Sequence, residues 1–297
     1  MKRLPALATA ALMLVVALTG CSVAESPTDD RVQVVASTVT YGDIASTLGG
    51  ARVNVVSIVT STAQDPHMYE ATARDRLAVS QADLILANGG GYDAFMASLI
   101  DDTQTPVLAA ADMVITDGSG SDDDLNEHVW YDLETIEEFA AAIAEQLSTV
   151  DPEGAEKYAT NLAEFTDDID TVRSRIDQLA ATVSGAHVFL TEPLGGYLAD
   201  SLGLNDVAPQ GFAAAVEAGN DVAPALMKTA LDTIAHGDVQ AVLSNIQTRG
   251  PETVRMEQAA TSASVPVVQL SELPPEDTDY IAWMTMVVDE LEAALQQ

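Results

Sequence analysis

Two of the four histidines stand in polar, turn-like segments, where an imidazole could bind a metal ion. His67 lies in Asp-Pro-His-Met-Tyr-Glu (65–70), just after a run of strand-forming residues. His128 lies in Asn-Glu-His-Val-Trp-Tyr-Asp (126–132), and a helix is expected to follow. Strand ends in open α/β sheets are where ligand sites form. A lone histidine in such a place is more often an ordinary loop residue, so spacing by itself leaves both interpretations open.

Motifs typical of enzymes are missing from the sequence. There is no His-Glu-x-x-His, no Gly-x-Ser-x-Gly and no Gly-Lys-Ser/Thr. The triplet Gly89–Gly91 lacks the lysine that a phosphate-binding loop needs. The acidic stretch 117–124 fails as a calcium loop of the EF-hand type, because its sixth position is Asp122 and its twelfth is His128. A solvated loop is the favoured interpretation of that stretch.

The start of the chain is typical of an exported lipoprotein. Lys2 and Arg3 precede an apolar run over 6–18, which is too short for a membrane span and indicates a secretory signal. Leu-Thr-Gly-Cys (18–21) then resembles a lipobox, in which Cys21 becomes the first mature residue and carries the lipid. An ordinary signal peptide with a chance cysteine is the alternative. We expect a signal peptide over 1–20 and a lipidated tether over 21–30. Because Cys21 is the only cysteine, an internal disulfide is excluded.

The charge is strongly negative, with 12 basic and 46 acidic residues and a formal net charge of −34. Loss of the two basic residues of the signal would leave the mature chain at −36 by the same count. Such a surface repels nucleic acid and anionic lipid headgroups. Solvation, or adaptation to a salty habitat, explains the bulk acidity better than metal attraction, which salt screens.

The body of the chain divides into three parts. Strand-like runs alternate with helical patterns over 31–150 and again over 186–297, which indicates mostly parallel sheets flanked by helices. The part between them, 151–185, opens on Asp-Pro-Glu, a good helix start, and then keeps one apolar stripe at spacings of three or four. The predicted fold is therefore α/β, with two lobes joined by one long linking helix.

Several short motifs, taken in order, resemble one family over nearly the whole mature chain. The resemblance is to the metal-binding solute receptors of manganese and zinc ABC importers, the family of ZnuA-like proteins and pneumococcal-type manganese receptors. The motifs are Asp-Pro-His-Met-Tyr-Glu (65–70), Asn-Gly-Gly-Gly-Tyr-Asp (88–93), Glu-His-Val-Trp (127–130), Thr-Glu-Pro (191–193) with Gly-Tyr-Leu (196–198), Asn-Ile-Gln-Thr (245–248), Ser-Glu-Leu-Pro (271–274) and Tyr-Ile-Ala-Trp-Met (280–284).

The resemblance implies a four-residue metal site. His67 and His128 would be the first two ligands, from the N-terminal lobe. Glu192 takes the third place, where zinc receptors usually have histidine and manganese receptors glutamate; helix capping is the alternative role for it. Glu272 is the candidate for the fourth ligand, although ungapped register puts Leu270 opposite the aspartate that is frequent there.

Two imidazoles and two carboxylates would give a neutral site for a divalent transition metal. Calcium and magnesium prefer an all-oxygen shell. Because a ligand histidine must be neutral, its reference pKa of about 6.5 predicts that metal affinity falls below that pH.

The expected function is capture of Mn²⁺ or Zn²⁺ between the lobes by an extracytoplasmic, lipid-anchored receptor that is not an enzyme. The expected partners are an ABC permease with its ATPase, and a membrane through the lipid on Cys21; nucleic acid is not one, and a monomer is expected. Two other functions remain open at this point. One is an extracellular metal-dependent hydrolase that uses the same ligands, and the other is a surface adhesin in which the metal is structural.

Overall fold

The structure, a computed structural model, describes residues 30–101, 103–114, 125–236 and 238–296. The chain from Arg31 onwards forms one compact unit. The predicted signal peptide, Cys21 and the acidic stretch 117–124 lie outside the described residues. In the part of the chain that is described, no helix has both the length and the apolar character needed to cross a bilayer.

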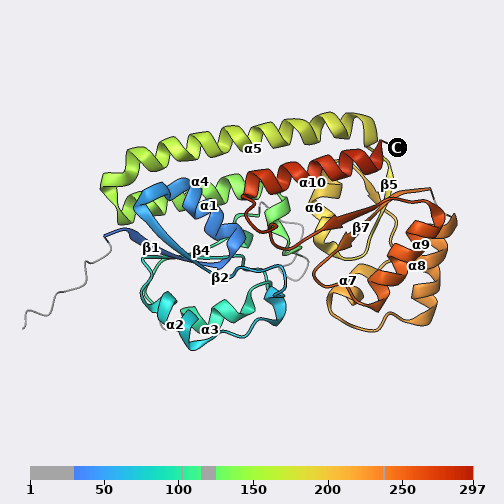
Figure 1. Ribbon diagram of the computed structural model, residues 1–297, viewed down its shortest axis with the longest axis horizontal. Helices are drawn as coiled ribbons and strands as arrows, with labels where there is room; N and C mark the ends of the chain where they lie inside the picture. The colour runs from blue at the N-terminus through green and yellow to red at the C-terminus, as the bar shows by residue number, and fades with distance from the viewer. Residues whose placement is uncertain (1–29, 102, 115–124, 237, 297) are drawn as a thin grey trace, which may run out of the picture. The chain divides into compact units, whose positions relative to one another are not determined.

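The N-terminal lobe contains a parallel four-stranded sheet in the order β2-β1-β3-β4 (Figure 1). Helices α1, α2 and α3 flank it (Figure 1). The strands are β1 (Val32–Thr38), β2 (Val53–Val59), β3 (Leu84–Ala87) and β4 (Val107–Ala109), and the helices are α1 (Val39–Gly49), α2 (Ala73–Ser80) and α3 (Ala97–Ile100).

The C-terminal lobe repeats this strand order with a second parallel sheet, β6-β5-β7-β8. In each lobe the first and third strands are central and the second and fourth are edges, so the two lobes share one topology. The strands are β5 (His187–Leu190), β6 (Asn205–Asp206), β7 (Val239–Asn245) and β8 (Val267–Leu270), and the helices are α6 (Gly196–Ser201), α7 (Phe212–Glu217), α8 (Pro224–His236) and α9 (Pro251–Ala263).

Most residues on both faces of each central strand are buried, which explains why these strands are mostly apolar rather than alternating. In β1, Val34 packs into a core shared by the two lobes, whereas Val35 faces a smaller core of the N-terminal lobe. In β7, Leu243 joins the shared core and Val242 faces a smaller core of the C-terminal lobe. Successive side chains of a strand point to opposite faces, so each sheet connects the shared core to one of its own.

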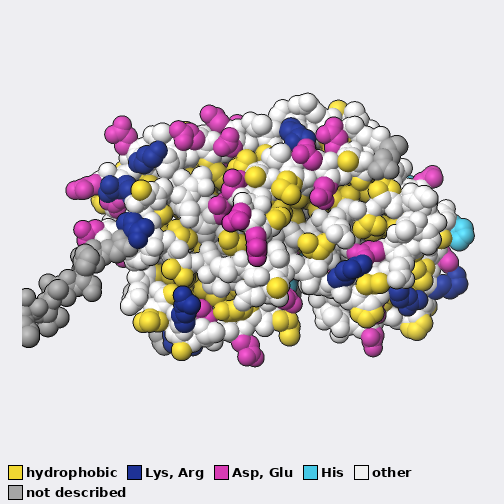
Figure 2. All heavy atoms as spheres, in the orientation of Figure 1, with side chains coloured by type: hydrophobic (Ala, Val, Ile, Leu, Met, Phe, Trp, Pro, Cys, Tyr) yellow, Lys and Arg dark blue, Asp and Glu magenta, His cyan; other side chains and the backbone are white. Residues whose placement is uncertain are grey.

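The long helix α5 (Ala155–Val183) links the lobes, as the sequence predicts. It contacts α1 and α4 (Leu133–Val150) of the first lobe and α6 of the second, and α10 (Tyr280–Leu295) packs beside it (Figure 1). Its buried stripe runs from Tyr158 to Val183 at helical spacing. Its exposed face carries acidic side chains (Figure 2), so this part of the net charge is a solvated helix face.

Two regions differ from the sequence expectation. The sequence of 92–100 has a helical pattern, but only a 3₁₀ turn (Ala94–Met96) and the short α3 form there. The cause is Asp93, whose carboxylate accepts hydrogen bonds from the backbone N–H groups of Asn88 and Gly89 at 2.6 and 2.9 Å and holds the preceding residues in a loop. The short elements β6 and α7 have no clear pattern in the sequence.

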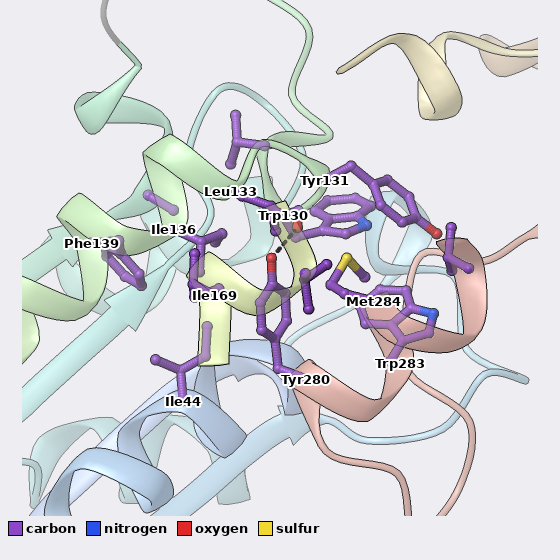
Figure 3. Close-up of a cluster of buried hydrophobic side chains, with 14 of the residues drawn as sticks. Ile44, Trp130, Tyr131, Leu133, Ile136, Phe139, Ile169, Tyr280, Trp283 and Met284 are labelled. Carbon is purple, nitrogen blue, oxygen red and sulfur yellow. Dashed lines mark hydrogen bonds between the residues drawn. The ribbon is translucent and has the colours of Figure 1, made fainter. Parts of the chain in front are cut away.

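A cluster of aromatic side chains lies in the core that the two lobes share (Figure 3). Trp130 and Tyr131 follow Val129 just after His128, and they face Tyr280 and Trp283 at the start of α10. The Tyr280 hydroxyl donates to the carbonyl of Trp130 at 2.7 Å, and the Tyr131 hydroxyl donates to the carbonyl of Ser271 at 2.8 Å. Because Ser271 precedes Glu272, this buried cluster joins two of the segments that carry predicted ligands.

Candidate metal centre

All four predicted ligands lie where strands end at their carboxyl edge, the usual place for ligands in parallel sheets. His67 belongs to a 3₁₀ turn (Pro66–Met68) in the connection after β2, and His128 precedes another (Val129–Tyr131) beyond β4. Glu192 follows β5 and Glu272 follows β8. The two lobes therefore contribute two residues each.

The two histidines lie close together, with their ring centroids 6.4 Å apart. Tyr92 contacts both rings edge-on, at 4.9 Å from His67 and 6.4 Å from His128. Trp130 lies 5.1 Å from His128 on another side, and only 1% of the His128 side chain is exposed. His67 is more accessible, at 25%, and its turn is capped by the Asp65 carboxylate, which accepts from the His67 N–H at 2.9 Å.

Asn126 determines which nitrogen of His128 is available. Its Oδ1 lies 2.7 Å from Nδ1 of His128, while its amide nitrogen donates to the carbonyl of Pro193 at 3.0 Å. An amide oxygen only accepts, so Nδ1 carries the hydrogen and Nε2 keeps its lone pair. For His67, Oε1 of Glu127 lies 3.3 Å from Nδ1 in the corresponding position. Two consecutive residues therefore orient the two imidazoles.

The triple-glycine loop supports Glu127. Gly89, Gly90 and Gly91 all have positive φ, at 78°, 64° and 103°, a conformation that favours glycine. A Cβ at Gly91 would lie 3.1 Å from Oε2 of Glu127, and Asn88 Nδ2 donates to the carbonyl of Glu127 at 2.9 Å. The absence of side chains in this loop therefore leaves room for the Glu127 side chain beside His67.

The two predicted carboxylates of the C-terminal lobe are buried and share one partner. Glu192 is 3% exposed and Glu272 is 1% exposed. The Asn245 amide nitrogen donates to Oε2 of Glu192 at 2.8 Å and to Oε1 of Glu272 at 2.9 Å. Thr248 donates to Glu192 at 2.7 Å, and Gln247 Oε1 accepts from the N–H of Glu272 at 2.7 Å. The motif Asn-Ile-Gln-Thr (245–248) thus holds both carboxylates in place.

Glu192 does not cap the helix that comes after it. It stands at the N-cap position of the turn Pro193–Gly195, but its side chain makes no capping hydrogen bond. Its oxygens accept from Asn245 and Thr248 instead. The capping role that the sequence left open is therefore wrong for this side chain.

The structure brings His67 within reach of two other predicted ligands, His128 in one group and Glu272 in a second. One possible ligand atom from each of His67, Glu127 and His128 lies within 4.8 Å of the others, and the same holds for Asp65, His67 and Glu272. His67 belongs to both groups. Glu192 belongs to neither, and it joins the set through the Asn245 bridge to Glu272.

Three carboxylates of this site were missed in the sequence. Asp65 and Glu127 are close to the histidines in the sequence motifs, and this proximity could have indicated them as site residues. Glu217 had no such signal, because it ends the unpredicted helix α7, yet its Oε1 lies 3.5 Å from Nε2 of His128.

Burial controls the protonation of the site. It raises the pKa of Glu272 to about 8 and those of Glu127 and Glu217 to about 7, and it also raises the pKa of Glu192. It lowers the pKa of His128 to about 3, with a smaller effect from His67. The imidazole is thus neutral and ready to coordinate, while the carboxylates favour protons until a cation replaces them.

Comparisons with known proteins agree with this fold and with the resemblance of the motifs. The manganese ABC transporter substrate-binding lipoprotein PsaA of Streptococcus mitis is 32% identical over 157 residues, 49% of this chain and 50% of that protein, so the chain spans about half the length of that relative. The metal ABC transporter substrate-binding lipoprotein ScbA of Streptococcus cristatus is 26% identical over 259 residues, 82% of this chain and 83% of that protein.

Among solved structures, the solute-binding protein FpvC of Pseudomonas aeruginosa in complex with Mn²⁺ superposes with a TM-score of 0.74 at 21% identity, over 90% of this chain and 99% of that one. At this identity the match shows the fold alone, and it confirms the two lobes of parallel sheets joined by a long helix. The model of one family, described as "Zinc-uptake complex component A periplasmic", matches residues 34–294. Because that match covers nearly all of the chain, the chain belongs to this family, ZnuA, as its motifs predict.

Proposed function

We propose that this protein is a receptor that captures a divalent transition metal ion between its lobes and delivers it to an ABC permease and its ATPase. One observation carries the proposal: His67 lies within reach of the buried imidazole of His128 from its own lobe and of the buried carboxylate of Glu272 from the other lobe. Nitrogen and carboxylate oxygen together suit manganese or zinc. The metal is the cargo, and we propose no catalytic role for it.

The donor set favours manganese as the cargo. Glu192 takes the place at which zinc receptors usually have histidine, and an imidazole there would favour zinc. Asn245 and Thr248 position its carboxylate, either oxygen of which could contact the metal. Carboxylates shift the preference towards harder ions, whereas zinc is satisfied by four ligands. The relatives PsaA and ScbA are named as substrate-binding lipoproteins of a manganese and of a metal ABC transporter, which supports the same class of cargo.

The lobes that would close on the metal are proposed as 31–150 and 186–297, with 151–185 as the linking helix. Hydrogen bonds already cross between them close to the site: Asn126 donates to the carbonyl of Pro193, and the Tyr197 hydroxyl donates to the carbonyl of Asn126 at 2.8 Å. With these links and the shared core, small loop adjustments would suffice for capture. The proposed form is a monomer that does not bind nucleic acid.

The test is metal binding by the whole purified chain. Calorimetric titration with Mn²⁺ and Zn²⁺ is expected to show one tight site per chain, and Ca²⁺ and Mg²⁺ are expected to bind far more weakly. Zn²⁺ is expected to bind at least as tightly as Mn²⁺ in vitro, since manganese stands lowest in the Irving–Williams order, so metal content after purification from the native host identifies the cargo. Absence of tight Mn²⁺ and Zn²⁺ binding, or steady turnover of ester or phosphate substrates by the metal-loaded protein, would contradict the receptor proposal.

We further propose that Cys21 carries the lipid that anchors the mature protein on the extracytoplasmic side of the membrane. The support is the apolar run ending in Leu-Thr-Gly-Cys, together with the lipoprotein names of relatives. Cys21→Ser is expected to release the protein from the membrane fraction into the soluble fraction, with metal affinity unchanged. Fractionation followed by immunodetection measures this, and membrane retention equal to that of the wild type would rule the anchor out.

A further inference from the structure

The available nitrogen of His128 has a neighbour outside the four predicted ligands. Oε1 of Glu217 lies 3.5 Å from Nε2, and among the described residues this buried oxygen accepts no hydrogen bond. Glu217 is the last residue of α7, and its side chain is 26% exposed. The helix is anchored at its other end, where Phe212 packs edge-on against Phe189 of β5 at 5.3 Å. The C-terminal lobe therefore positions the Glu217 carboxylate beside His128.

The distance fits two ligands of one metal ion better than a hydrogen bond. Bonds of about 2.1 Å to nitrogen and to oxygen, at a tetrahedral angle, place the two ligand atoms about 3.4 Å apart. The observed separation is 3.5 Å, beyond the ordinary hydrogen-bond range. Nδ1 of the same ring shows the contrast, since it lies 2.7 Å from its partner Asn126. Nδ1 is thus hydrogen-bonded, whereas Nε2 faces the Glu217 oxygen at the distance expected for two ligands of one metal ion.

Glu272 gives independent evidence that a cation belongs here. It is 1% exposed, and its Oε2 has no hydrogen-bond partner among the described residues. An ionised carboxylate with one buried oxygen left without a partner is costly unless a cation compensates it. Its ligand atom lies within 4.8 Å of one on His67.

We propose that Glu217 is a further metal-contacting residue that gives the site a fifth donor side chain and shifts its preference towards manganese. This inference rests on the proposed function. With His67, His128, Glu192 and Glu272, a third carboxylate makes the donor set richer in oxygen than zinc requires. Because Glu217 comes from α7 and His128 from the other lobe, the shared metal would also tie α7 to the N-terminal lobe.

The experiment compares Glu217→Gln with Asp221→Asn in the full chain. Asp221 is exposed in the connection after α7, so its replacement removes the same charge from the same region without touching His128. Glu217→Gln is expected to weaken Mn²⁺ binding by about 10- to 100-fold, the range found when supporting groups of metal sites are removed. Zn²⁺ binding should weaken less, and Asp221→Asn should leave both affinities within about twofold, because an exposed charge is screened.

The absorption spectrum of the Co²⁺-loaded protein tests contact itself. Loss of a donor moves cobalt towards four-coordinate geometry, which strengthens its visible bands, so Glu217→Gln should give the stronger spectrum and Asp221→Asn the wild-type one. A role for Glu217 in folding alone would not produce this change.

Three outcomes decide the matter. If the wild type binds Mn²⁺ and Glu217→Gln binds it equally well, Glu217 is not a ligand and only this inference falls. If Glu217→Gln binds more tightly, the carboxylate competes with the metal for His128, and the inference is again overturned. If the wild type binds neither metal, the proposed function falls and this inference with it.

Discussion

His128→Ala is expected to reduce the affinity for both Mn²⁺ and Zn²⁺ by more than about 100-fold, because removal of merely supporting groups already costs 10- to 100-fold. The imidazole is 1% exposed and oriented by Asn126, so neither water nor another side chain readily takes its place. Its loss leaves Glu217 without the nitrogen that it faces, and with one imidazole fewer the donor set is less suited to a transition metal.

His236→Ala is the matched control. His236 lies exposed in the last turn of α8, where it is not part of the site, and its replacement should leave both affinities unchanged. Calorimetric titration of the three proteins makes the measurement, and a melting curve of each metal-free protein verifies folding. Wild-type affinity in a folded His128→Ala protein would remove His128 from the ligand set.

Metal affinity is expected to rise at least about tenfold per pH unit from pH 6 to about 8 and then to level off, because each proton displaced by the metal contributes that slope. The main proton is that of Glu272, whose pKa burial raises to about 8. His128 holds no proton in this range, since its pKa is about 3. The sequence expectation of a histidine-controlled fall below about 6.5 is therefore replaced by a carboxylate-controlled change at higher pH. An affinity that is flat above pH 6.5 would contradict this.

The stability of the metal-free protein should depend on pH in the opposite sense. A carboxyl whose pKa is raised on folding stabilises the fold below its ordinary value of 4.5 and loses that contribution as pH rises through about 8. His128, with its pKa lowered from 6.5 to about 3, stabilises above 6.5 and loses its contribution as pH falls towards 3. The two effects oppose each other between 4.5 and 6.5, so the melting temperature should fall from about pH 6.5 to 8.

Glu272→Gln separates this effect from other titrations. The amide has no proton to lose, so the fall above pH 6.5 should be smaller in this variant than in the wild type. Glu276→Gln, at an exposed position of the same connection, should retain the wild-type slope. Added Mn²⁺ should raise the wild-type melting temperature most at the highest pH, where Glu272 is ionised. Equal slopes for all three metal-free proteins would mean that burial of Glu272 does not control the profile.

Local sequence patterns are sufficient to predict most of the helices and strands and the family of this protein. The apolar stripe of 151–185 predicts the linking helix because a helix repeats every 3.6 residues, and the structure forms α5 there. The alternation of strand-like runs with helical patterns predicts parallel sheets flanked by helices, and the structure forms two parallel four-stranded sheets. The ordered motifs indicate the family, and through it His67, His128, Glu192 and Glu272 as candidate ligands.

The contacts through which these residues act together could not be predicted from local patterns, because they join segments that are distant in the chain. Asn126 and Glu127 orient the two imidazoles, and Asn245 bridges two carboxylates that are 80 positions apart in the chain. Glu217 reaches His128 from a six-residue helix whose pattern is too short to predict. The protonation of Glu272 follows from burial, which depends on every element packed around it. Sequence patterns report local geometry, whereas coordination, burial and charge coupling arise only when folding brings distant segments within a few ångströms of one another.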